Sequence, residues 1–122
     1  MLFATYGTAC AFTPDPQRPG KALIPFDSLT GHPIDDLWAR WLSLDPVRMV
    51  ARHVAALAGM RRIYLDAGRQ DEFFLDLGAL ALSRELTRLG VEHSLELFDG
   101  NHDGVDRRMP AAIAELTRAL RR

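Results

Sequence analysis

Cysteine and lysine are nearly missing from this sequence, which contains one of each, Cys10 and Lys21. A single cysteine excludes a disulfide framework within the chain, so we expect a reducing compartment, the cytoplasm. Free cysteine among apolar neighbours usually behaves as a small buried hydrophobe, and we expect Cys10 to be buried. Because lysine is so rare, the basic residues are almost all arginine, which we attribute to coding bias rather than to a binding signal.

An excess of charge of one sign is also missing. The chain has 15 basic and 16 acidic residues among 122, a formal net charge of −1. This balance gives no electrostatic reason to expect nucleic acid or an anionic membrane as a partner. The opening stretch, MLFATYGTACAF, lacks the charged leading region of a signal peptide, and no run approaches the length of a membrane span. With 48% hydrophobic residues, residues 1–122 have the size and composition of a single domain.

The first part of the chain contains few regular patterns. Residues 1–5 are predicted as a short buried strand, and the many prolines and glycines in residues 13–33 favour irregular structure. Apolar spacing predicts a helix over residues 34–42. We interpret residues 13–45 as an irregular, cap-like region. Asp45 and Pro46 then have the N-cap and first-turn character of another helix, which we expect to end at Gly59.

Residues 61–122 follow a strand–helix–strand–helix order. The strands are predicted at residues 62–68 and 91–98, and a long helix between them is closed by Gly90. A last helix covers residues 109–120, with Ile113, Leu116 and Leu120 expected to face inward. A helical crossover between consecutive strands is typical of a parallel sheet with helices packed on it. The predicted fold class is therefore α/β.

Polar side chains gather in the two loops that follow these strands. The first loop, DAGRQDEFF, contains Asp66, Asp71 and Glu72, and the second, FDGNHDG, contains Asp99, His102 and Asp103. The carboxyl ends of neighbouring parallel strands lie side by side, and ligands bind there in open sheets. An acid and a histidine can therefore meet at this edge, as they do where a carboxylate orients an imidazole that acts as a general base.

Metal binding is the competing interpretation of these loops. Asp99-x-Asn101-x-Asp103-Gly104 resembles the start of a calcium loop, but its twelfth position, which needs a bidentate glutamate, is Pro110. The four histidines also lack the short spacings that are typical of zinc ligands: they are His32, His53, His93 and His102. We therefore expect no metal.

Structural roles remain open for the same residues. His102 suits a surface turn between glycines, and Asp71 suits the N-cap of the following helix, a role that is compatible with holding a histidine. His93, inside a strand, favours a structural or surface role. Trp38 and Trp41 favour packing in the core or in a lid over contact with a substrate.

The segment from Ile63 to Asp106 resembles the C-terminal part of the putative-esterase family of α/β hydrolases, which includes esterase D (S-formylglutathione hydrolase), enterochelin esterases and mycolyl transferases. The family pattern ends a strand with Asp-x-Gly-x-x-Asp-Glu/Gln-Phe and later reaches a Gly-x-His turn. The resemblance implies that Asp71 is the triad acid and that His102 is the triad base. Asp66 matches the strand-end aspartate, which is not the triad acid. IPFD and the proline-rich stretch before it resemble the cap region of some bacterial members.

The sequence departs from the family in one respect, because it contains no Gly-x-Ser-x-Gly nucleophile elbow. The resemblance places that elbow before Met1. The chain is therefore expected to be the C-terminal part of a serine carboxylesterase acting on a small-molecule ester or thioester, without a cofactor and inactive alone. The exposed edge of a partial sheet predicts a homo-oligomer or a separate N-terminal piece. The alternative is a non-catalytic binding or assembly module that retains half of the hydrolase fold.

Overall fold

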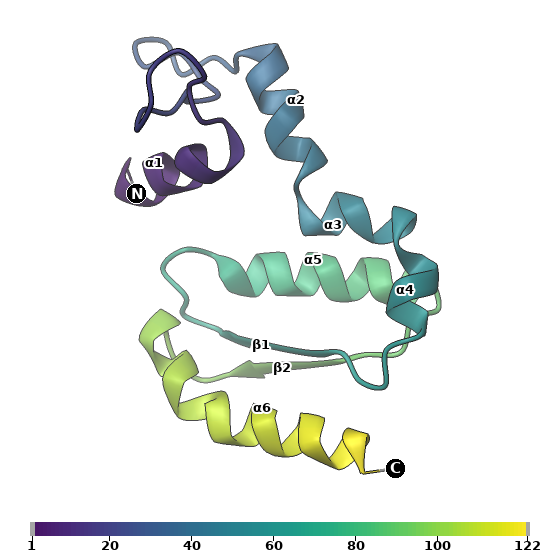
Figure 1. The fold of residues 1–122 in the computed structure, drawn as a ribbon. Coiled ribbons are helices and arrows are strands. Elements are labelled where there is room, and N and C mark those ends of the chain that lie inside the picture. The colour runs from purple at the N-terminus through teal and green to yellow at the C-terminus, as the bar shows by residue number, and fades with distance from the viewer. Residues whose placement is uncertain (1, 122) are drawn as a thin grey trace. The chain divides into compact units, whose positions relative to one another are not determined.

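The computed structural model describes residues 2–121, with side-chain environments from residue 4 onward (Figure 1). The chain, treated above as one domain, consists of two compact units, Met1–Met49 and Val50–Arg122. Each unit is described by itself. Within the described residues, no helix combines the length and the apolar character that crossing a membrane requires.

The first unit begins with α1 (Leu2–Phe12), so the predicted strand over residues 1–5 is wrong for its described part. Met1 lies outside the described residues. An apolar run has no clear period, and only its length of about a dozen residues favours a helix over a strand. Ala9 is buried, whereas Cys10 on the same helix is exposed, so the expectation that Cys10 is buried is also wrong.

Residues 13–33 form turns, bends and isolated bridges without a regular helix or strand, as predicted. Single bridges join Pro14 to Ala22 and Phe26 to Pro33. The helix α2 (Asp35–Ser43) follows, and Trp41 attaches it to the end of α1. Trp41 contacts the Phe12 ring edge-on at 5.7 Å between centroids and donates from Nε1 to Thr13 Oγ1 at 3.0 Å.

The predicted helix after Asp45 exists but is broken into pieces. Asp45 Oδ1 accepts the Val47 N–H at 2.9 Å, which confirms the N-cap of α3 (Pro46–Met49). A 3₁₀ turn, η1 (Val50–Arg52), interrupts the helix before α4 (Val54–Ala58) begins. Gly59 ends α4 as its C-cap.

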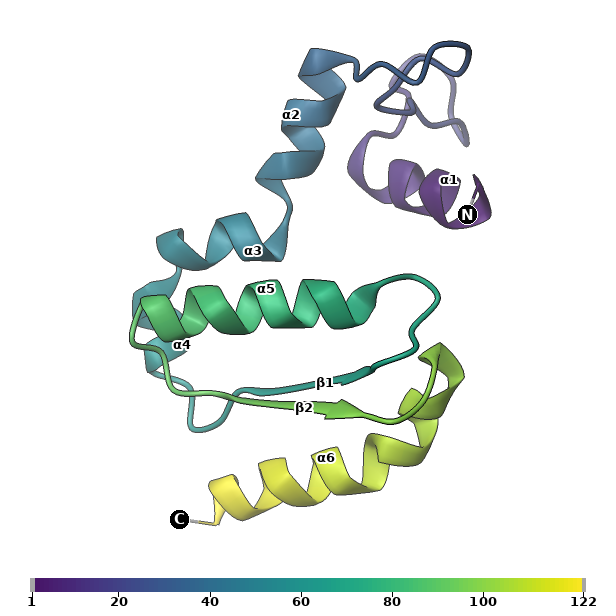
Figure 2. The same ribbon diagram turned by 180° about the vertical axis from the view of Figure 1, so that it is seen from behind.

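The second unit is a two-stranded parallel sheet between two helices (Figures 1 and 2). The strand β1 (Tyr64–Gly68) pairs with β2 (Ser94–Phe98), residue for residue from Tyr64 opposite Ser94 to Gly68 opposite Phe98. The helix α5 (Leu75–Arg88) covers one face and α6 (Val105–Leu120) lies against the other. The unit is α/β with a parallel sheet, which confirms the predicted class at this level.

The core of this unit lies on the α5 side of the sheet. Its fully buried members are Val50, Leu86 and Val91, and six partly buried apolar residues surround them: Val54, Leu57, Ile63, Leu65, Leu82 and Leu89. Gly90, with φ +70°, reverses the chain after α5. There the Gly90 and Val91 N–H groups bond to Thr87 and Leu86 carbonyls, a Schellman turn that confirms the predicted helix end.

The opposite face of the sheet is polar, and α6 turns charged residues toward it. Arg108 bonds Asp66 at 3.1 Å, and Glu115 accepts from Arg62 at 2.6 Å. The apolar residues of α6 point elsewhere: the exposed fractions are 52% for Met109, 56% for Ile113, 41% for Leu116 and 67% for Leu120. The expectation that Ile113, Leu116 and Leu120 face inward is therefore wrong, because the surface beneath the helix contains charged partners for its polar side.

Candidate active site

The acid of the site, Asp71, lies in the turn between β1 and α5. Its side chain is only 1% exposed. One carboxylate oxygen, Oδ1, accepts the backbone N–H groups of Phe73 at 2.8 Å and Leu75 at 3.4 Å. Asp71 therefore caps the turn that leads into α5, although the helix itself begins later than predicted, at Leu75.

The other carboxylate oxygen contacts the histidine that follows β2. Asp71 Oδ2 lies 3.1 Å from His102 Nδ1, across 31 positions of sequence. A carboxylate can only accept, so Nδ1 carries the proton, and neutral His102 has its lone pair on Nε2. The His102 side chain is 43% exposed, so one buried and one accessible group form the pair. The structure thus brings together the two residues that the sequence singles out.

Backbone contacts hold the two loops against each other. Arg69 N–H donates to the Phe98 carbonyl and Gln70 N–H to the Gly100 carbonyl, both at 2.9 Å. A Cβ added to Gly68 would lie 2.4 Å from the Gly100 oxygen, nearer than any side-chain carbon can approach backbone. Glycine at position 68 is therefore required for this approach.

The pKa of the Asp71 carboxyl is shifted below its ordinary value of 3.8. Burial alone raises this pKa, but the hydrogen bonds from His102 and from the Phe73 and Leu75 N–H groups together outweigh it. A carboxyl with a lowered pKa stays ionised at neutral pH. Asp71 can therefore accept from Nδ1 and stabilise a positive charge on the imidazole.

The neighbours of Asp71 also contact the histidine. Glu72 Oε2 accepts the His102 backbone N–H at 3.2 Å, and the Phe73 ring meets the imidazole edge to face at 5.0 Å. The next residue, Phe74, has φ +59°, an uncommon left-handed conformation for a bulky side chain. Sequence reasoning named Glu72 only as an available acid and missed Phe73, whose adjacency to Asp71 is the signal that could have indicated it.

Asp66 belongs to a different cluster, under α6. Its Oδ2 bonds Arg108 Nε at 3.1 Å and the Tyr64 hydroxyl at 2.9 Å, and Arg108 also pairs with Glu96. Burial, and then the bond to the Asp66 carboxylate, raises the pKa of Tyr64. The Arg108 guanidinium lies 5.6 Å from the centre of the Phe98 ring. These contacts join α6 to the sheet, so Asp66 belongs to this cluster and not to the Asp71–His102 pair.

The remaining candidate acids of the second loop are Asp99 and Asp103. Asp99 accepts from the Gln70 side chain at 2.8 Å, and the segment His102–Gly104 forms a 3₁₀ turn, η2. Among residues 2–121, no group of three or more potential ligands is arranged to hold a metal ion. His93 bonds the Val91 carbonyl through Nδ1 at 3.0 Å and Ser83 Oγ through Nε2 at 2.7 Å, which confirms its structural role.

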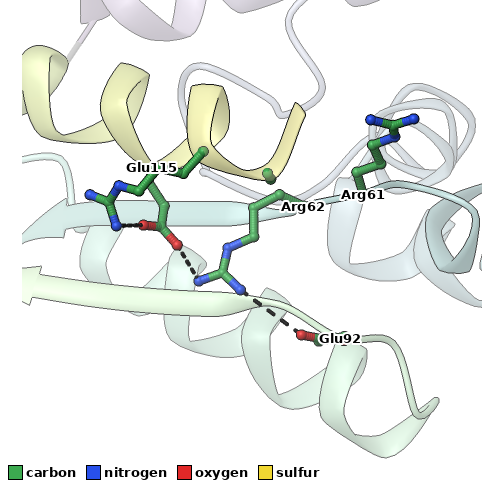
Figure 3. A pocket seen from close by; sticks show the side chains of 6 residues that line it. Arg61, Arg62, Glu92 and Glu115 are labelled. Atoms are coloured by element: carbon green, nitrogen blue, oxygen red, sulfur yellow. Dashed lines mark hydrogen bonds and ion pairs between the residues drawn. The ribbon is translucent and has the colours of Figure 1, made fainter. Parts of the chain in front are cut away.

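Two cavities of the second unit lie beside these clusters. One, of about 370 Å³, is lined by residues 98–101, Asp103 and Gly104 of the loop after β2, together with Arg107 and Arg108, and His102 is not among its lining residues. The other, of about 450 Å³, lies between α6 and the strand starts, where Glu115 bridges Arg62 and Arg118 (Figure 3). Glu115 therefore pairs with Arg62, which joins α6 to the segment before β1, and with Arg118 within α6 itself.

The sequence was compared with known proteins. No protein-family model matches it, and no curated protein matches it significantly.

Proposed function

We propose that this chain is the C-terminal part of a serine carboxylesterase, and that it supplies the acid and the base of a Ser-His-Asp triad. The observation that carries the proposal is the contact between buried Asp71 and accessible His102, 3.1 Å apart. The strand-end spacing of Asp71 and the Gly-x-His turn match the esterase pattern. The parallel pairing of β1 and β2 supports a partial α/β-hydrolase fold.

In the complete enzyme, His102 Nε2 takes the proton of the serine hydroxyl as the oxygen attacks the ester carbonyl. The same nitrogen then gives this proton to the leaving alcohol or thiol. Asp71 holds the Nδ1–H throughout and stabilises the imidazolium that forms between the two transfers. The low pKa of Asp71 suits this role, because the carboxylate has to remain ionised while the imidazole is protonated.

The serine hydroxyls of the second unit have other surroundings. Ser83 bonds His93, and Ser94 Oγ is buried in the polar face of the sheet without a partner. Neither stands in the Gly-x-Ser-x-Gly setting that exposes a nucleophile. Without an attacking serine and its oxyanion donors, the pair has no alkoxide to generate, and a loss of this kind costs on the order of 10⁶ in rate. The chain alone is therefore an inactive part of the enzyme.

Hydrolysis of p-nitrophenyl acetate by the purified chain tests this proposal, with His102→Ala as the matched control. Because free imidazole attacks such activated esters slowly, 4-methylimidazole at the same concentration sets the baseline. We expect no turnover beyond that baseline from either protein. Faster turnover that requires His102 would mean that a nucleophile lies within these residues, and the proposal would be wrong.

A second candidate, a non-catalytic assembly module, is favoured by the exposed apolar residues of α6. We call Met109, Ile113, Leu116 and Leu120 the α6 stripe. Their spacing of four, three and four residues places them on one side of the helix, as in the seam of a coiled coil. Water-exposed apolar rows of this kind mark interaction surfaces. Under either function, the stripe and the free edges of the two-stranded sheet are the surfaces for a second copy or for a separate N-terminal piece.

A further inference from the structure

Three consecutive residues contact His102, each at a different place. The Asp71 carboxylate accepts a hydrogen bond from the ring nitrogen Nδ1, and Glu72 accepts one from the backbone N–H. The Phe73 ring packs against the imidazole in a T-shaped arrangement. All three come from the turn before α5, and all reach across to the loop after β2. A single short segment therefore restrains the charge, the main chain and the ring orientation of one histidine.

Glu72 acts on the main chain at the point where the histidine loop changes direction. Its Oε2 accepts the His102 N–H at 3.2 Å, at the first residue of η2. The nearest backbone–backbone hydrogen bond between the loops, from Gln70 N–H to the Gly100 carbonyl at 2.9 Å, lies two residues earlier. Glu72 therefore fixes the Cα of His102 with respect to Asp71, which that earlier tie alone does not do.

Phe73 acts on the imidazole itself. The two rings are 5.0 Å apart between centroids and inclined at 80°, the edge-to-face arrangement that aromatic pairs prefer. One hydrogen bond at Nδ1 still permits the ring to rock about that bond, and a perpendicular aromatic neighbour removes this freedom.

The conformation of the turn before α5 allows Asp71, Glu72 and Phe73 to contact His102 at three different places. Asp71 Oδ1 accepts the N–H groups of Phe73 and Leu75, which holds the turn closed around the carboxylate. Phe74 takes up the left-handed conformation, so that α5 can begin directly afterwards. The geometry that ties down Asp71 thus also sets where Glu72 and Phe73 point.

We propose that Glu72 and Phe73 are positioning residues, which fix the backbone and the ring of His102 against Asp71 before any substrate binds. The significance of this for catalysis rests on the proposed function. The restraint of His102 by these two residues is a property of this chain, so it can be measured without any enzymatic activity. A negative result would therefore overturn the positioning proposal without bearing on the esterase proposal.

The test is the solvent exchange of the His102 Nδ1 proton, followed by NMR on the ¹⁵N-labelled chain and assigned with His102→Gln. We expect Glu72→Ala and Phe73→Leu each to speed this exchange by about threefold or more, because the restraint that keeps the Nδ1–H on Asp71 is weakened. Glu72→Gln and Phe73→Tyr, which keep an acceptor and an aromatic ring, should stay near the wild-type rate. Asp103→Ala, in the same loop, serves as the matched control.

His93 provides an internal reference, because its Nδ1 bonds the Val91 carbonyl away from the site. Faster exchange at His102 with an unchanged His93 signal supports the proposal. Exchange at His102 that stays at the wild-type rate in both Glu72→Ala and Phe73→Leu would overturn it. Parallel changes at His93 and His102 would also overturn it, since they would assign these residues to the stability of the whole unit rather than to positioning.

Discussion

The two carboxylate oxygens of Asp71 make different contacts. Oδ1 closes the turn before α5, and Oδ2 receives His102. The sequence predicted the cap, because an aspartate shortly before a helix suits one, and the family resemblance singled out Asp71 as the partner of His102. The contacts of Glu72 and Phe73 were missed: their adjacency to Asp71 was the available signal, but the contacts themselves depend on the close approach of two loops about thirty residues apart.

The lowered pKa of Asp71 gives a prediction for stability against pH. A folded-state pKa below the ordinary 3.8 means that ionised Asp71 stabilises the fold, fully above the unfolded-state pKa and progressively less as pH falls through the folded-state value. The free energy of unfolding of the wild type should therefore fall more steeply than that of Asp71→Asn below about pH 4.

Chemical denaturation across acidic pH measures this difference, and Asp103→Asn, which replaces an exposed aspartate of the neighbouring loop, is the control. Parallel curves for the wild type and Asp71→Asn would contradict the assigned hydrogen bonds, because Asp71 would then have the same pKa in both states.

At the scale of elements, the second unit was predicted well and the first less so. Strands β1 and β2, helix α5 and its end at Gly90 follow from apolar patterns and from glycine in a turn. In its described part, residues 2–5, the strand predicted over residues 1–5 is a helix, because a run that is apolar all round has no period that tells a helix from a strand. The orientation of α6 was predicted wrongly. Ion pairs with Asp66 and Arg62 determine which side of the helix faces the sheet, and the sequence pattern of the helix alone does not contain those partners.

The approach of the two loops depends on Gly68, and substitution tests this directly. In Gly68→Ala the new Cβ would lie 2.4 Å from the Gly100 oxygen and 2.8 Å from the Asn101 oxygen, so the loops must separate. We expect a loss of stability of about 1–3 kcal/mol, as for other overpacked sites, and loss of the slowly exchanging His102 Nδ1 proton.

Gly78→Ala is the matched control, since the position lies in α5 with open space around it. This variant should instead gain up to about 1 kcal/mol through helix propensity. If Gly68→Ala behaved like Gly78→Ala, the close packing of the two loops would be wrong.

At the scale of the whole molecule, the exposed α6 stripe departs from what a self-sufficient domain would show. Ion pairs fill the inner side of α6, and its apolar side chains are left in water. The stripe predicts association in solution at micromolar concentration, measured by sedimentation velocity or light scattering. Changing Ile113 and Leu116 together to Glu should shift the chain to a monomer, because two charges would be buried in an apolar contact.

Ala114→Glu places the same charge at an exposed position of α6 outside the stripe and should leave association unchanged. A wild-type chain that is monomeric under these conditions would contradict self-association, and a separate N-terminal piece would then be the remaining partner for the stripe.

The central claim, that Asp71 and His102 are the acid and base of an esterase triad, is tested most directly by transplantation. Residues 61–122 replace the corresponding part of a complete enzyme of the putative-esterase family, and kcat/KM for p-nitrophenyl acetate is measured. We expect an active chimera whose kcat/KM falls by roughly three orders of magnitude or more in His102→Ala and in Asp71→Asn. An active chimera that is indifferent to both substitutions, or a folded chimera without activity, would contradict it.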